Sequence, residues 1–212
     1  KNSSDYIDDY VNLYKIVSDY SDYVTINISS PNTPGLRDMQ NKEQFERLIT
    51  KLSMIKKKRK TFIKLSPEIS DKNLKNICKI SMNEELITGL ILTNTTIKRE
   101  MLFKKPVKDS WKINEDGGLS GHPLRTLSNK LIEKVYQICG GKIMIIGVGG
   151  VYNGKDAFEK ISLGANLVQL YTSLVFRGPN VVNDILEQLS KKLKEKKIDN
   201  VKDLIGKKIS YE

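Results

Sequence analysis

In the stretch VTINISSPNTPGLR, residues 24–37, polar residues come directly after a segment with the alternating pattern of a strand. Its first apolar residues recur at every second position, which is the period of a pleated strand. Two prolines and a glycine then end the strand, because proline cannot donate to a β-ladder and glycine frees the backbone. Hydroxyl and amide groups placed against a strand end predict a binding surface, since they offer both donors and acceptors.

A lysine interrupts a second strand pattern, TFIKLS, which begins at Thr61. Lys64 has apolar neighbours on both sides, so its ammonium group should be partly desolvated. A buried lysine is costly unless an anion accompanies it. The pattern therefore predicts an anionic ligand or a carboxylate partner, and the alternative is an edge position from which Lys64 reaches solvent.

Glycines follow a third strand pattern in IIGVGGV, residues 145–151. The run matches a dinucleotide-binding fingerprint only in part, because the third glycine is missing at the required spacing. Together with GGLSG at residues 117–121 and QLYT at residues 169–172, it favours a phosphate site built from backbone N–H groups at the last two strands. The alternative is that these glycines serve only to make turns.

Other chemistries have weaker support in the sequence. The chain has one histidine, His122, and no G-x-S-x-G motif, so nucleophilic hydrolysis is disfavoured. Its two cysteines form no CxxC pair, which favours a reducing compartment and no metal site.

The net charge of +11 allows either an anionic partner or a lysine-rich solvated surface. The basic run at residues 56–60 contains no aromatic residue on which bases could stack, so nucleic acid is disfavoured as a partner. No apolar run approaches the ~20 residues that span a bilayer, and residues 1–20 show no signal-peptide pattern. The first residue is Lys1, which leads us to expect a fragment or a processed product.

Strand and helix patterns alternate along the chain. Strand patterns cover residues 23–29, 61–66, 89–94, 142–150 and 166–172, and the middle three are nearly continuous apolar runs typical of parallel strands. Apolar residues at helical spacing occur in residues 6–17, 45–55, 74–78, 131–138, 158–161 and 185–193. Ser70 is a candidate N-cap for the third helix, and the fourth follows Ser128.

This βα alternation predicts a parallel sheet in a single domain over residues 1–212, with an insertion at about residues 97–120. Each strand ends in polar residues or glycine. Function gathered from the ends of many strands is typical of a (β/α)8 TIM barrel, whereas a doubly wound sheet concentrates it at one switch point. We therefore expect the last five βα units of a TIM barrel.

Six motifs, taken in chain order, closely resemble the dihydroorotate dehydrogenase family, specifically its quinone-dependent class 2. They are NISSPNTPGLR, FIKLSP, GLILTNTT, GGLSGHPLR, IIGVGGV and NLVQLYTSLVFRGP. The resemblance runs from Lys1 to about Ile205. It implies an FMN-dependent oxidoreductase that oxidises dihydroorotate to orotate in pyrimidine (UMP) biosynthesis and passes the electrons to a membrane quinone.

The resemblance also implies roles for matching residues. Ser30 falls at the position of the catalytic base, and we expect Thr33 or a water to relay its proton, because a serine hydroxyl alone is a poor base. Lys64 matches the lysine at the flavin pyrimidine edge, where negative charge accumulates on reduction. The positions that match substrate contacts are Asn27, Asn32, Asn94 and Thr95. Those that match FMN contacts are Asn27, Lys64, Thr93, Ser120, Gly121, Val148, Gly149, Gly150, Leu170, Tyr171 and Thr172.

The chain departs from the family pattern at its start. Lys1 aligns just after the third barrel strand, so we expect this piece to lack a closed barrel and to be inactive by itself, with an open sheet edge that favours aggregation. The family's N-terminal helices, which admit quinone, imply peripheral attachment to a bacterial inner or mitochondrial inner membrane. The alternatives are a class 1 type enzyme with a soluble acceptor, in which a cysteine replaces Ser30, and an inactive fragment that binds FMN or phosphate.

Overall fold

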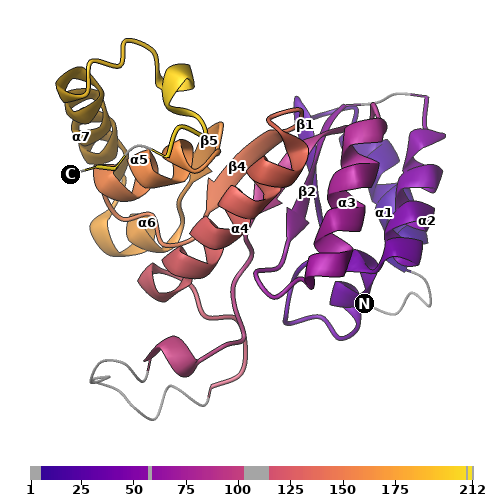
Figure 1. Ribbon diagram of the computed structural model, residues 1–212. Coiled ribbons are helices and arrows are strands. Elements are labelled where there is room, and N and C mark those ends of the chain that lie inside the picture. The colour runs from indigo at the N-terminus through magenta and orange to yellow at the C-terminus, as the bar shows by residue number, and fades with distance from the viewer. Residues whose placement is uncertain (1–5, 57–58, 103–114, 209, 212) are drawn as a thin grey trace.

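The computed structural model describes residues 6–56, 59–102, 115–208 and 210–211 (Figure 1). Its five-stranded sheet has the order β1-β2-β3-β4-β5, and every neighbouring pair is parallel. The strands are β1 (Tyr23–Asn27), β2 (Lys60–Leu65), β3 (Ile87–Leu92), β4 (Met144–Val148) and β5 (Leu167–Gln169). All five predicted strands are confirmed, but β1, β4 and β5 are shorter than the predicted 23–29, 142–150 and 166–172.

One helix precedes β1, and each strand is followed by one or two helices. They are α1 (Tyr6–Val17), α2 (Lys42–Ser53), α3 (Asp71–Asn83), α4 (Arg125–Cys139), α5 (Gly154–Ser162), α6 (Thr172–Arg177) and α7 (Val181–Glu195). Ser70 caps α3 as predicted, because its side chain accepts a hydrogen bond from the backbone N–H of Asn73. Ser128 is buried inside α4 rather than preceding it. The sequence did not predict α6, whose residues continue the apolar run of β5.

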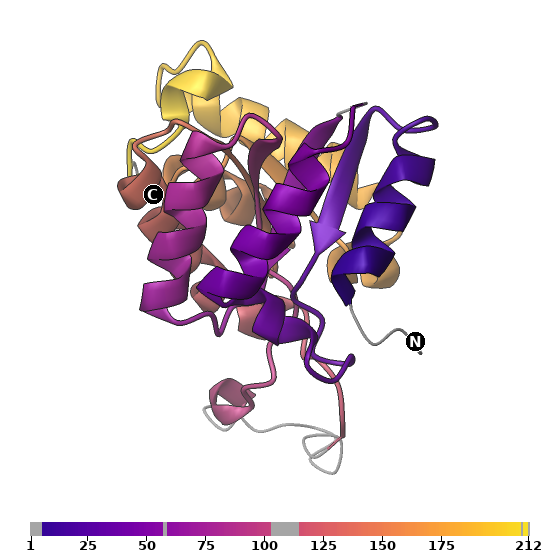
Figure 2. The same ribbon diagram turned by 90° about the vertical axis from the view of Figure 1, so that its right-hand side faces the viewer.

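The strands follow one another in space as they do in sequence, and so do the helices. Helices α1, α2 and α3 lie side by side on one face of the sheet (Figures 1 and 2). A doubly wound sheet would require the strand order to reverse at a switch point. The order seen here is that of a barrel wall, so the predicted partial (β/α)8 barrel is confirmed.

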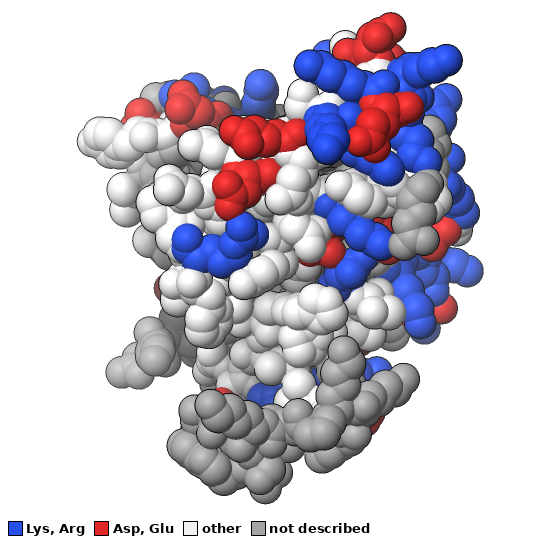
Figure 3. Space-filling view, turned by 90° about the vertical axis from the view of Figure 1, so that its left-hand side faces the viewer, with Lys and Arg blue, Asp and Glu red and all other residues white. Residues whose placement is uncertain are grey.

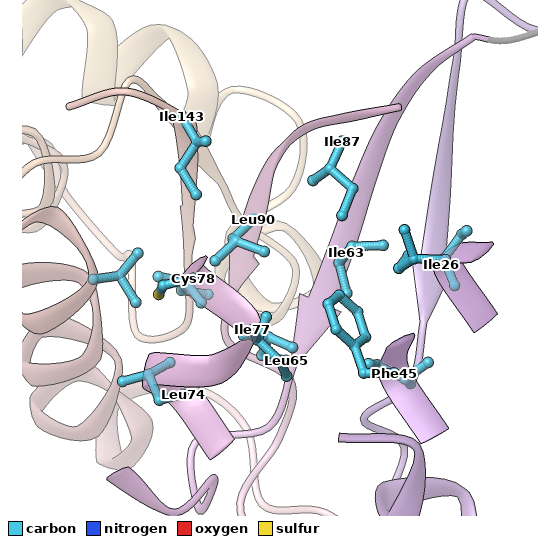
Figure 4. Close-up of a cluster of buried hydrophobic side chains, with 14 of the residues drawn as sticks. Ile26, Phe45, Ile63, Leu65, Leu74, Ile77, Cys78, Ile87, Leu90 and Ile143 are labelled. Atoms are coloured by element: carbon cyan, nitrogen blue, oxygen red, sulfur yellow. The ribbon is translucent and has the colours of Figure 1, made fainter. Parts of the chain in front are cut away.

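Apolar side chains cover both faces of the sheet. The larger cluster packs the sheet against its helices, and Figure 4 shows Ile63, Leu65 and Leu90 facing Ile77 of α3 within it. A smaller cluster of Phe62, Ile91 and Ile146 lies on the opposite face. Side chains alternate between the two faces along each strand. The residue two positions after each member of this smaller cluster therefore lies on the same face, at the carboxyl end of its strand.

The open sheet has β1 and β5 at its edges within the described residues. No helix in the described part of the chain is long and apolar enough to cross a membrane.

Candidate active site

A cavity of about 1030 Å³ lies at the carboxyl ends of the strands. It gathers residues that are far apart in the sequence, because parallel strands end at the same edge of a sheet. The predicted site residues that line it are Lys64, Thr93, Asn94, Thr95, Ser120, Gly121, Val148, Gly149, Gly150, Leu170, Tyr171 and Thr172. Asn27, Ser30, Asn32 and Thr33 belong instead to β1 and the loop that follows it.

Two predicted substrate-contact residues, Asn27 and Asn94, meet across the ends of β1 and β3. The Oδ1 atom of Asn27 accepts hydrogen bonds from Asn94 Nδ2 (3.1 Å) and from Ser29 Oγ (2.7 Å). Asn94 Nδ2 also donates to Ser29 Oγ at 3.0 Å. This three-residue cluster fixes both amides and joins the loop after β1 to the wall of the cavity.

Ser30, the predicted base, is half-buried beside this cluster. Its Oγ atom accepts a hydrogen bond from the backbone N–H of Asn32 at 3.3 Å, which closes a short turn. Asn32 Oδ1 would lie 3.5 Å from a Cβ atom built on Gly117, so the tip of this loop packs near residues 117–118. Thr33 lies in the same loop, three residues beyond Ser30.

Tyrosines of α1 hold the loop that carries Ser30. Tyr10 donates its hydroxyl to the Asn27 carbonyl at 2.6 Å, and Tyr6 donates to the Pro34 carbonyl at 2.7 Å. Burial raises the pKa of Tyr10 to about 12, so this hydroxyl stays protonated and remains a donor. The loop is thus anchored at both ends to a helix that precedes it in the chain.

Lys64 lies on β2, which is paired on one side with β1 and on the other with β3. The alternative of an edge position is therefore wrong. Its side chain lines the cavity, and burial lowers its pKa. Among the described residues, no acceptor hydrogen-bonds or ion-pairs with its ammonium group. The charge of Lys64 is available to a ligand in the cavity.

Glycines shape the opposite end of the cavity. Gly149 and Gly150 have φ angles of 111° and 71°, in the region that favours glycine. A Cβ atom on Gly150 would lie 2.5 Å from the Arg125 Cβ and 2.8 Å from its backbone nitrogen. The turn therefore lies directly against the start of α4. Successive backbone N–H groups in such a turn can form a cradle for an anion, and Gly149–Gly150 is called the glycine cradle below.

Two hydroxyl groups flank this glycine turn. Thr172 Oγ1 and Ser120 Oγ are 3.0 Å apart, and both residues line the cavity. Gly121 lies beside them, and a Cβ atom there would come within 3.1 Å of the Thr172 side chain. Hydroxyl donors and exposed backbone N–H groups suit the oxygens of a phosphate group. The residues at this end fit the phosphate of a nucleotide cofactor.

The predicted insertion at residues 97–120 is closed at its base. Thr96 and Leu119 form an antiparallel bridge with two backbone hydrogen bonds, of 3.1 Å and 2.7 Å. Arg99 donates from Nη2 to the Gly117 carbonyl at 2.6 Å. Residues 103–114, the middle of the insertion, lie outside the described residues. Its described base packs against Thr95, since a Cβ atom on Gly118 would overlap the Thr95 side chain.

Some residues that hold the loops and helices around the site could not be recognised from the sequence. Arg37 and Glu68 form an ion pair of 2.9 Å between the loops after β1 and β2. Lys160 is completely buried in α5. Its only sequence signal is its spacing, three residues after the buried Ala157, which places a lysine on the buried face of the helix.

Comparisons with known proteins identify the family of this chain. The family model described as dihydroorotate dehydrogenase matches residues 1–193. The mouse protein named dihydroorotate dehydrogenase (quinone), mitochondrial, is 41% identical; the alignment covers 97% of this chain and 52% of the mouse protein. A quinone-type relative from Bartonella tribocorum is 40% identical, over 96% of this chain and 57% of that protein.

A solved structure shows the same fold. DHODH from Eimeria tenella in complex with ferulenol superimposes with a TM-score of 0.88 at 32% identity, covering 97% of this chain and 59% of that chain. The parallel barrel wall, with a cavity at its strand ends, places the chain in the class of (β/α)8-barrel proteins. Within that class, the chain belongs to the dihydroorotate dehydrogenase family. It spans about half the length of the curated relatives it matches.

Proposed function

We propose that the complete protein oxidises dihydroorotate to orotate with FMN as cofactor and a membrane quinone as electron acceptor. The main support for this proposal is the arrangement of the residues in and beside one cavity. Polar residues that follow β3 line it, and the Asn94 amide among them is hydrogen-bonded to Asn27 of β1. Lys64 of β2, which has no acceptor among the described residues, and the glycine cradle line it as well. The names of the relatives support the quinone-dependent reaction.

The cavity suits a flavin nucleotide in charge as well as in shape. FMN, when bound, would supply the acceptor for the hydride from C6 of dihydroorotate. Gly149, Gly150, Ser120 and Thr172 would hold its phosphate through backbone N–H groups and hydroxyls. Lys64 would lie at the pyrimidine edge of the flavin, where its positive charge stabilises the electron density gained on reduction. The absence of a protein acceptor for Lys64 among the described residues supports this role.

Ser30 would remove the proton from C5 of dihydroorotate. Its hydroxyl is half-buried and belongs to a loop that α1 anchors, so its position is restricted. A base must pass its proton onward, and Thr33 or a water would accept it. Asn27, Asn32, Asn94 and Thr95 would bind the substrate ring through amide and hydroxyl groups, and the contact between Asn27 and Asn94 pre-orients two of them.

An apolar surface beside the cavity suits the quinone. Tyr171 and Phe176 line the cavity and are also largely exposed, and the exposed Leu174 and Val175 continue this surface along α6. Uncharged side chains cover much of this side of the molecule (Figure 3). We propose that the apolar oxidant reaches the flavin here, and that the complete protein is peripherally attached to a mitochondrial or bacterial inner membrane.

The test uses protein expressed from its complete coding sequence. The bound flavin is released by heat and identified by chromatography, and dihydroorotate is then added to the holoprotein under anaerobic conditions. We expect FMN, and bleaching of the flavin absorbance. Bound FMN that stays oxidised would retain the cofactor site but exclude dihydroorotate as the substrate.

A further inference from the structure

Lys160 is a lysine with 0% of its surface exposed, which is rare unless its ammonium group has partners. Its Nζ atom donates to Ser128 Oγ and to Asn129 Oδ1, both at 2.8 Å. Both acceptors are neutral side chains on α4. The proposed reaction gives no role to this buried cation.

The side chain of Lys160 runs beneath the end of β4. Its Cδ atom lies 3.2 Å from the position of a Cβ atom on Gly147, so the absence of a side chain there leaves room for the lysine. Ser128, which accepts from Lys160, donates in turn to the Val148 carbonyl at 2.6 Å. The next two residues are Gly149 and Gly150. Two hydrogen bonds therefore join the ammonium group to the residue that precedes the cradle.

Few positively charged side chains among the described residues are available to contact a phosphate at the glycine cradle. Among the described residues that line the cavity, only Lys64 and His122 can carry positive charge. Arg125, which packs against Gly150, is already paired with Asp156 at 3.0 Å and with Glu159. A phosphate dianion at the cradle would have Lys160, behind the turn, as a nearby buried cation.

We propose that Lys160 is a positioning residue for the flavin phosphate: it holds the Gly149–Gly150 turn through Ser128 and supplies positive charge from behind it. The inference rests on the proposed FMN site and assigns to it a residue that does not touch the ligand. Because the lysine is shielded from solvent, its field at the cradle is screened less than that of a surface lysine.

The titration of Lys160 supports this assignment. The pKa of Lys160 is lowered to about 7, mainly by burial; Glu159 and Asp156 on α5 oppose this shift, and Arg125 on α4 adds to it. Without a ligand, the group is therefore largely neutral at pH 8. A phosphate dianion at the cradle would favour the charged form. Binding of FMN at pH 8 should therefore draw a proton onto Lys160.

The first test compares two ligands that differ only in the phosphate. FMN and riboflavin are titrated into apoprotein made from the complete coding sequence, as the wild type, Lys160→Met and the control Lys130→Met. Lys130 is an exposed lysine on α4. Lys160→Met should weaken FMN binding about tenfold and leave riboflavin binding within about twofold, since only FMN carries the charge that Lys160 meets. Lys130→Met should change neither.

Three outcomes of this test would contradict the proposed role of Lys160 or the phosphate site itself. Unchanged FMN affinity in Lys160→Met would overturn the proposal, and so would an equal loss for both ligands, which indicates a structural role alone. A wild-type protein that binds FMN no better than riboflavin would contradict the phosphate site itself, and with it the proposed function.

The second test measures protons rather than affinity. Calorimetric titrations at pH 8, in two buffers of different ionisation enthalpy, give the number of protons taken up on binding. The phosphate is fully ionised at this pH, since its second pKa is about 6. We expect uptake with FMN, little with riboflavin, and loss of the difference in Lys160→Met. The same uptake in that variant would assign the proton to another group and overturn the proposal.

Discussion

Arg37 and Glu68 form a half-buried ion pair that ties together the loops after β1, β2 and β3. The Nη1 atom of Arg37 lies 2.9 Å from Glu68 Oε2. The other donors of Arg37 reach the Ser29 carbonyl at 3.2 Å and the Thr95 carbonyl at 3.1 Å. Glu68 also accepts hydrogen bonds from the Thr96 hydroxyl and the Ile97 N–H. The pair therefore fixes the loop of the proposed base relative to the wall of the cavity.

Arg37→Lys should slow flavin reduction by dihydroorotate. A lysine keeps the charge but cannot make three directed hydrogen bonds at once, so the loop that carries Ser30 would lose its alignment. We expect about a tenfold lower rate of flavin reduction and a loss of about 1–3 kcal/mol in the free energy of unfolding. The measurements are anaerobic stopped-flow absorbance and denaturant unfolding.

The matched control is Arg59→Lys. Arg59 is also half-buried and donates to a backbone carbonyl, that of Ser18 at 2.7 Å, but it precedes β2 at the end of the sheet away from the cavity. It should lose stability without a change in reduction rate. Equal rate losses in both variants would mean that Arg37 acts only through global stability.

Gly150→Ala should abolish flavin binding. The added methyl group would meet the backbone of Arg125, which cannot move without shifting α4, and φ is positive at this position. Gly140→Ala is the control, because Gly140 also has a positive φ but has no atom within 4 Å of its Cβ position. Gly140→Ala should lower the free energy of unfolding by about 1–2 kcal/mol and keep its bound flavin. The ratio of flavin to protein absorbance measures the difference, and a flavin-loaded Gly150→Ala would contradict the cradle.

The contribution of Lys160 to stability should depend on pH. Its pKa is about 7 in the folded apoprotein and near 10.5 when unfolded, so the unfolded state binds more protons between these values. The free energy of unfolding of the wild type, relative to Lys160→Met, should therefore rise with pH, by about 1.4 kcal/mol per unit at most. Below pH 7 the difference should be constant. Denaturant unfolding of both apoproteins at pH 7, 8 and 9 tests this, and a difference that is flat across this range would show that Lys160 is not held neutral.

Val175→Asp should slow reoxidation of the reduced flavin by quinone. Val175 is 66% exposed on α6, and a carboxylate there would disfavour an apolar oxidant. Reduction by dihydroorotate should stay within about twofold of the wild type, because Val175 is not among the residues that line the cavity. The control, Val201→Asp, alters an exposed valine of the turn Val201–Leu204. An unchanged quinone KM in Val175→Asp would place the oxidant elsewhere.

Much of the fold follows from local patterns in the sequence. The apolar runs of β2, β3 and β4 and the helical spacing in α2 and α3 predict a parallel sheet with helices, because each element buries a periodic face. The residues of α6 extend an apolar run, and only tertiary packing ends β5 at Gln169. Local pattern cannot indicate where such a run changes from strand to helix.

The candidate site, too, could be predicted from the sequence only in part. Glycines and polar residues at the strand ends indicate a cavity, and the structure gathers most of the predicted site residues around it. The pairing of Arg37 with Glu68 and the hydrogen bonds from Lys160 to α4 could not be predicted. They join residues 31 or more positions apart, and their partners are set by the barrel geometry.

The role of Ser30 as the base can be tested by the rate of flavin reduction. Holoprotein from the complete coding sequence is mixed anaerobically with dihydroorotate, and the flavin absorbance is followed in the wild type, Ser30→Ala and Ser53→Ala. Ser53 is a serine at the end of α2, away from the cavity, whose hydroxyl donates to the Thr50 carbonyl. We expect rapid bleaching in the wild type and in Ser53→Ala, and a rate lower by a factor of about 10² or more in Ser30→Ala, with the flavin still bound. Bleaching of Ser30→Ala at the wild-type rate would exclude Ser30 as the base.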